Sequence, residues 1–160
     1  MEDKIQWKPV WIVTKFADDS AFDKGEHFER NIVEGNLALN EGITRALNLL
    51  IGGGGTAFNN ANSYLGVGDS ATAASASQTG LQAATNKLYK AMEATYPSIA
   101  SQTVTFRSVF GSSEANFAWE EFTVANGNSD ASENLNRKVS SQGTKASGQV
   151  WTLDLQLTLG

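Results

Sequence analysis

The sequence predicts a mainly β fold, an antiparallel β-sandwich or barrel with one α-helix and long Gly/Ser/Ala loops. Several short apolar runs lie between turns rich in Gly, Asn and Ser, as in all-β domains. Only residues 36–51 carry a helical period. The C-terminal segment alternates strictly, which indicates a strand with one buried and one wet face; its apolar positions are Trp151, Leu153, Leu155, Leu157 and Leu159.

Residues 1–35 are predicted to form an N-terminal strand or arm with an acidic loop, and residues 36–160 a β-rich body, in one compact domain overall. Residues 5–16 read as a strand, 17–27 as the acidic loop and 27–34 as a short strand. Pro9 cannot donate to a ladder, which marks an edge or an arm entering a sheet. The segment is either an arm that adds to a neighbouring sheet or the first strand of its own core. Its candidate assembly contacts are Trp7, Pro9, Trp11, Phe16 and Phe22.

The predicted helix, residues 36–51, has an apolar stripe at the i, i+3, i+4, i+7 and i+8 positions, formed by Ile43, Ala46, Leu47, Leu50 and Ile51. Asn36 or Asn40 is the expected N-cap, and the glycines from Gly52 should end the helix. Strands are expected at 62–68, 87–92, 103–110, 117–124, 135–140 and 150–160. A long ordered loop should span 69–86.

Composition excludes several function classes. The net charge of −5 and pI of about 4.8 disfavour binding to phosphate backbones, so no nucleic-acid partner is expected. The absence of Cys removes thiolate metal sites and a Cys nucleophile. No run approaches the roughly 18 apolar residues of a membrane helix, and Met1-Glu2-Asp3-Lys4 does not resemble a signal peptide. We expect a protein made in a cytoplasm, without a membrane partner or cofactor.

Gly68-Asp69-Ser70 matches the three letters that open the nucleophile block of one serine-esterase family. A serine nucleophile needs a histidine base held by a carboxylate. His27 is the one histidine and lies upstream, so a tight turn is the preferred interpretation. The Gly52–Gly55 run lacks the Lys-Ser/Thr of a phosphate-binding loop. Gly66-Val67-Gly68 lacks the third glycine of a dinucleotide fingerprint.

Two groups of side chains with oxygen or nitrogen atoms could be metal ligands. For both we prefer the interpretation that they are polar residues of surface loops and turns. One places His27 beside carboxylates; the other alternates side-chain oxygens in a turn, without the bidentate Glu of a calcium loop. The groups are Asp23, Glu26, His27 and Glu29, and Asn126, Asn128 and Asp130. We predict no metal site.

Glu120 and Glu121, with Glu114, are candidate paired carboxylates of the kind that glycosidases use. Neighbouring strand residues point to opposite faces, so these two are not expected to flank one substrate. If Trp119 faces the core, Glu121 shares that face and needs a partner, for which we expect Arg107 or Lys90. A structural ion pair is the default, and a ligand cleft stays open as an alternative. No catalytic residue is predicted.

Four stretches together resemble a family of small virion proteins from tailed bacteriophages. They are 52–82 around Tyr64-Leu65-Gly66-Val67-Gly68-Asp69-Ser70, then Trp119–Gly127, then Leu135-Asn136-Arg137-Lys138, then Thr144–Trp151. The pattern is a "GVGDS" strand and turn, a Thr/Ser-rich loop, a "W-x-E-F-x-V-x-N" strand, an "N-R" strand and a final alternating strand. The resemblance covers roughly residues 36–160.

The resemblance implies a head-decoration, or cement, protein on the exterior of the capsid. Such a protein binds the major capsid protein and copies of itself, often as trimers at three-fold positions, and needs no catalytic residue. The alternative is a tail, neck or fibre component, with or without a carbohydrate-binding face. An esterase acting through Ser70 is the third hypothesis.

Overall fold

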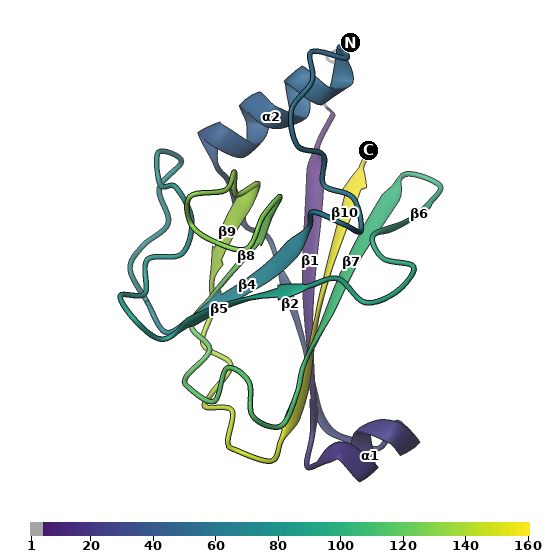
Figure 1. Cartoon of the computed structure of the whole chain (residues 1–160), viewed down its shortest axis with the longest axis vertical. Coiled ribbons are helices and arrows are strands. Elements are labelled where there is room, and N and C mark those ends of the chain that lie inside the picture. The colour runs from purple at the N-terminus through teal and green to yellow at the C-terminus, as the bar shows by residue number, and fades with distance from the viewer. Residues whose placement is uncertain (1–4) are drawn as a thin grey trace.

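The structure, a computed structural model that describes residues 5–160, is a sandwich of two five-stranded antiparallel sheets (Figure 1). This confirms the predicted fold class and selects the sandwich over the barrel. In spatial order, the first sheet comprises β2 (His27–Glu34), β1 (Trp7–Phe16), β10 (Val150–Leu159), β7 (Thr103–Phe110) and β6 (Ser98–Ala100). The second comprises β3 (Leu37–Ala38), β9 (Asn136–Val139), β8 (Glu121–Ala125), β4 (Tyr64–Gly68) and β5 (Lys87–Ala91).

The core lies between the sheets, where alternating positions of β1, β7 and β10 meet β4 and β8. The predicted alternation of β10 is confirmed as far as Leu157, because Trp151, Leu153, Leu155 and Leu157 are all buried, whereas Leu159 at the end of the strand is exposed at 43%. Trp119 is the centre of an aromatic group and contacts Phe110 and Trp151 edge-on, at ring-centroid distances of 4.8 and 4.9 Å. Such edge-to-face pairs add about 0.5–1.5 kcal/mol each beyond the burial of their area.

β1 is a central strand, paired with β10 along its length and with β2 from Val10 onward. Pro9 lies where β2 has ended. Its carbonyl oxygen accepts a hydrogen bond from the Gly35 N–H at 2.9 Å. The N–H that proline lacks would point to the same side, past the end of β2, so no ladder bond is lost. Residues 7–9 therefore form a local edge of a strand that is otherwise enclosed on both sides.

The predicted helix is present but shorter. α2 spans Asn40–Leu50, after β3 has taken part of the expected range, and its N-cap is Leu39 without a side-chain cap bond. The expected cap at Asn36 or Asn40 is therefore wrong. The helix ends as predicted, because Gly52 adopts φ 68° and its N–H bonds to the Leu49 carbonyl.

Three further elements differ from the prediction. The acidic segment contains a short helix, α1 (Asp19–Lys24), since the Asp18 carboxylate caps the Ala21 N–H at 2.8 Å and Gly25 ends it at φ 71°. β6 was not expected. β8 begins at Glu121, not at residue 117. The residues before it leave the ladder, which lets Trp119 enter the core although Glu121 points to the opposite side.

Candidate functional site

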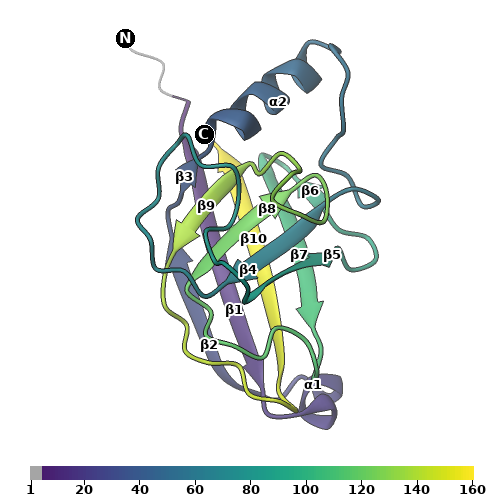
Figure 2. The ribbon, with the colours of Figure 1, turned by 60° about the vertical axis from the view of Figure 1, so that its left-hand side comes forward.

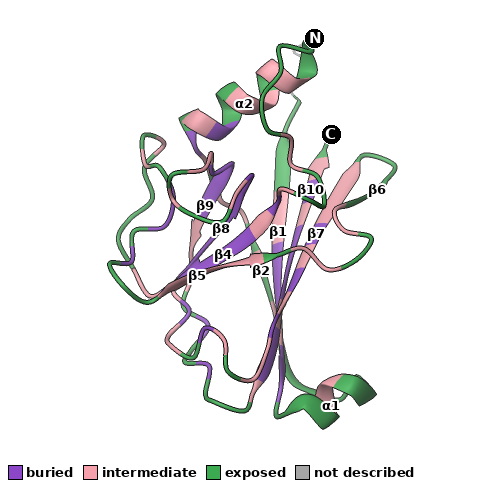
Figure 3. Ribbon diagram, in the orientation of Figure 1, coloured by how far each residue is buried: buried purple, intermediate pink, exposed green. Residues whose placement is uncertain are grey.

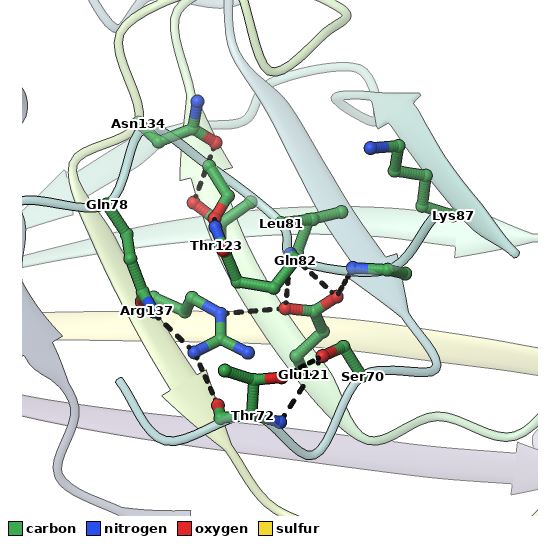
Figure 4. Close-up of polar contacts among 12 residues, drawn as sticks. Ser70, Thr72, Gln78, Leu81, Gln82, Lys87, Glu121, Thr123, Asn134 and Arg137 are labelled. Carbon is green, nitrogen blue, oxygen red and sulfur yellow. Dashed lines mark hydrogen bonds and ion pairs between the residues drawn. The ribbon is translucent and has the colours of Figure 1, made fainter. Parts of the chain in front are cut away.

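The outer face of the second sheet is covered by the loop 69–86, which is ordered as predicted but belongs to no helix or strand (Figure 2). Side chains from β5, β8, β9 and the β8–β9 connection lie beneath this loop (Figure 4), and Glu121, Asp130 and Arg137 among them bond its backbone. We call them the polar cluster: Lys87, Tyr89, Glu121, Thr123, Asp130, Asn134 and Arg137. The loop is thus held by carboxylates and a guanidinium, with Leu81 and Ala83 as its buried apolar contacts.

Glu121 and Arg137 form an ion pair at the centre of the polar cluster, and both side chains are fully buried. The Arg137 Nε donates to a Glu121 carboxylate oxygen at 2.7 Å, and its Nη1 donates to the Thr72 carbonyl at 2.8 Å. The carboxylate also accepts from the Gln82 and Ala83 N–H groups at 2.8–3.0 Å. Each charge therefore bonds the other and the loop backbone, although the Arg137 Nη2 has no hydrogen-bond partner among the described residues.

The expected partners of Glu121 were wrong. Arg107 bonds Asp154 on the outer face of the first sheet, at 2.7 Å from Nε to Oδ1. Lys90 bonds Glu114 at 2.6 Å. Both partners were expected on the assumption that Glu121 shares the face of Trp119. Glu121 lies on the opposite face, so neither Arg107 nor Lys90 is its neighbour. The "N-R" motif supplies the true partner, Arg137 on the adjacent strand β9, although nothing in the spacing alone identified it.

Asp130 forms the second anchor of the loop. Its carboxylate accepts from the Leu81 N–H at 3.0 Å and from the Tyr89 hydroxyl and the Lys87 ammonium. Burial and the hydrogen bond to Asp130 raise the pKa of Tyr89 well above its usual value, so the phenol stays protonated as a donor. The loop passes close enough that Gly80, at φ 118°, has no room for a side chain: a Cβ would lie 2.8 Å from Asp130.

The two glycines of the "GVGDS" motif have steric roles in this arrangement. A Cβ on Gly66 would lie 2.8 Å from the Thr123 side chain and 2.9 Å from the Tyr89 ring. A Cβ on Gly68 would lie 2.4 Å from the Glu121 carboxylate. The glycines therefore make room on the sheet surface for the groups that bind the loop. The motif accounts for packing, not for chemistry.

The remaining candidate chemical groups are dispersed or already bonded. The Ser70 hydroxyl accepts from the Thr72 N–H at 3.2 Å within its own turn. His27 is exposed at the start of β2, in the other sheet. Asn126 donates to the Thr56 carbonyl at 2.9 Å. Among residues 5–160, no group of three or more His, Asp or Glu side chains is placed to hold a metal ion.

A second site lies at the end of the sandwich that carries α2. The helix is attached to the body through small and polar residues. Gly42 packs on the β8–β9 connection so closely that a Cβ would lie 2.3 Å from the Leu135 Cα. One turn later, the Arg45 guanidinium pairs with Glu133, at 3.0 Å from Nε and 2.5 Å from Nη2. The side of α2 that bears Gly42 and Arg45 therefore faces the body.

The apolar stripe of α2 faces solvent instead. Figure 3 shows burial on this helix confined to its first turn. The exposed fractions of the predicted stripe reach 80%, and its large members are Ile43 (40%), Leu47 (57%), Leu50 (80%) and Ile51 (79%). An aliphatic face of this kind, left uncovered beside a rigid body, marks a protein interaction surface more often than a free surface.

Next to this stripe, an apolar pocket of about 430 Å³ opens between α2 and the ends of β1, β7 and β10. Ala46 and Leu49 of α2 form one wall, and Leu157 lies on the opposite wall. Three exposed apolar side chains stand at the pocket: Trp7 (46%), Ile99 (78%) and Leu159 (43%). We call the α2 stripe and this pocket with its rim the apolar end.

The five candidate assembly contacts divide between the surface and the core. Trp7 lines the pocket of the apolar end, and Pro9 is half-buried beside it on β1. Trp11 is completely buried against Phe122, at a centroid distance of 5.6 Å. Phe16 is buried at the far end of β1, where Phe22 of α1 packs edge-on at 5.2 Å.

No protein-family model matches the sequence, no curated protein matches it, and no solved structure matches its fold. Across residues 5–160, none of the helices combines the length and apolarity that crossing a bilayer requires.

Proposed function

We propose that this chain is a non-enzymatic structural protein of a virion, which decorates the capsid by binding the major capsid protein and copies of itself. The observation that carries the proposal is the apolar end. Its aliphatic stripe on α2 is uncovered although the same helix is firmly attached through Gly42 and Arg45. Burying such a stripe against another protein contributes roughly 25 cal/mol for each Å² of apolar surface removed from water.

The choice of a decoration protein rests on the resemblance, and the geometry explains why its motif residues matter. The "GVGDS" glycines, Glu121 and Arg137 all serve to hold the loop 69–86 against the second sheet. A rigid body with one apolar end suits repeated docking on a shell. Three copies around a three-fold position are the expected assembly, with the apolar ends in contact with neighbouring proteins.

The oligomeric state of the purified chain tests the proposal. The wild type should sediment as an oligomer, and Leu47→Gln/Leu50→Gln should shift it to the monomer while the helix is kept, because Gln favours helices. Thr44→Gln, an exposed polar position on the same helix, is the matched control and should leave the oligomer intact. The wild type should also bind capsids that lack it. A wild-type monomer without affinity for capsids would refute the proposal.

Immunogold labelling distinguishes the decoration protein from a tail, neck or fibre component. Antibody to the chain should label the whole head of the particle. Label confined to one vertex would reject the decoration role and favour the alternative.

A further inference from the structure

β2 is a free edge of the first sheet. Among residues 5–160 it pairs with β1 alone, at the margin opposite β6, and Figure 2 shows it at the left edge of the first sheet. Its eight residues form a long edge strand, which is regular from Glu29 to Glu34 and has a register irregularity at Phe28. Phe28 and Ile32 are exposed at 55% and 59%. Unpaired strand edges of this length are templates for pairing with another chain unless something covers them.

The hydrogen-bond pattern shows which β2 residues have free main-chain groups. The Gly35 N–H donates to the Pro9 carbonyl, so odd-numbered residues of β2 turn their N–H and C=O toward β1. Arg30, Ile32 and Glu34 therefore turn theirs to the free edge. On that side the described residues supply one contact, from the exposed Lys138 ammonium to the Glu34 carbonyl at 2.8 Å. A carbonyl has two lone pairs, so this contact leaves one free.

The charges on β2 select one register for a two-fold pair of these strands. In an antiparallel pair, directly opposite residues lie on the same face of the sheet. With Ile32 opposite its own copy, Arg30 lies opposite Glu34 of the second chain, and the same ion pair forms again on the other side of the axis. Centring the pair on Arg30 or on Glu34 would oppose like charges, and centring it on Asn31 would oppose Arg30 to Ile32.

We propose that β2 is a second self-association surface, which pairs with β2 of another copy around a two-fold axis at Ile32. The pair joins the first sheets of two copies into one continuous sheet of ten strands, twice the five of one copy. It uses main-chain hydrogen bonds and exposed ion pairs, not apolar burial, and is separate from the apolar end. Such a small contact is weak in dilute solution and becomes effective where copies are held close together, as on a shell.

Disulfide trapping detects this pair, because the chain has no native Cys. Hydrogen-bonded antiparallel partners have Cα atoms about 5.5 Å apart, which a disulfide spans. Ile32→Cys should therefore form a covalent dimer under mild oxidation. Phe28→Cys, equally exposed on the same strand, is the control. In this register the two copies of position 28 lie roughly 27 Å apart, eight residues at about 3.4 Å each, so it should stay monomeric.

Charge reversal tests the register in the Ile32→Cys background. Arg30→Glu should abolish the covalent dimer, since it opposes two carboxylates, and Arg30→Glu/Glu34→Arg should restore it. Restoration excludes unfolding as the cause of the loss. Equal cross-linking of Phe28→Cys, or no loss with Arg30→Glu, would overturn the proposal. Adding Leu47→Gln/Leu50→Gln should leave the cross-link intact, so failure of the apolar end and failure of the β2 pair are distinguished.

Discussion

On the outer face of the second sheet, a carboxylate and a guanidinium are fully buried under a loop, whereas at the end of the sandwich a helix turns four large aliphatic side chains to solvent. Both regions reverse the usual distribution of polar and apolar groups. The charges of the polar cluster and the loop amides bond one another within one chain, and the Arg137 Nη2 is the one buried polar atom of the cluster without a partner among the described residues. At the apolar end, by contrast, the stripe is not covered by any other part of the chain that the structure describes. The contrast supports the proposal that partner proteins bind at the second region, whereas the first region stabilises the single chain.

The largest effect is expected from breaking the buried ion pair. Arg137→Met leaves the Glu121 carboxylate buried without its cation, and loss of one partner of such a pair costs about 3–5 kcal/mol. Chemical denaturation should report this loss in the free energy of unfolding. The double variant Glu121→Leu/Arg137→Met removes both charges and should recover part of it. A double variant no more stable than Arg137→Met would show that the loop amides, not the charges, dominate.

The sequence predicted the helix and the strands of these two regions better than it predicted which of their side chains are buried. The α2 stripe was identified from its 3.6-residue period, but periodicity states which residues share a face, not whether that face is covered. Gly42 is the residue that turns the stripe outward, and its close approach to Leu135 joins positions far apart in the chain. Glu121 was assigned to the wrong face because a continuous strand was assumed from residue 117. The alternation of apolar and polar residues in the sequence does not show where strand pairing breaks next to Trp119.

An intermediate effect is expected where the apolar end joins the body. Gly42→Ala places a methyl group 2.3 Å from the Leu135 Cα, so backbone must shift. Overpacking of this kind typically costs about 1–3 kcal/mol, more than the roughly 1 kcal/mol that alanine gains in a helix. The unfolding free energy should fall, and the oligomer should weaken because α2 is displaced. Gly111→Ala is the control, since its nearest neighbour would be an ordinary 3.5 Å away. Equal stability of the two variants would contradict the close packing.

The smallest effect is expected from pH, acting through the ion pair that fastens α2. Hydrogen bonds from Arg45, opposed by burial and assisted by Asn126, lower the pKa of Glu133 below its ordinary value of 4.5. A carboxyl whose folded pKa is lowered stabilises the fold above its unfolded pKa and loses that contribution as pH falls through the folded value.

The stability difference between wild type and Glu133→Gln should therefore be present at pH 7 and shrink below about pH 4.5, the ordinary value for Glu. Since both side chains are partly exposed, at 21% and 32%, solvent screening should keep the ion-pair contribution under about 1 kcal/mol. Denaturation at pH 7, 5 and 3 measures it, and Glu26→Gln controls for loss of an exposed carboxylate. A difference that grows toward low pH would mean that Glu133 is held in its neutral form, and that α2 is fastened by Gly42 without help from the ion pair.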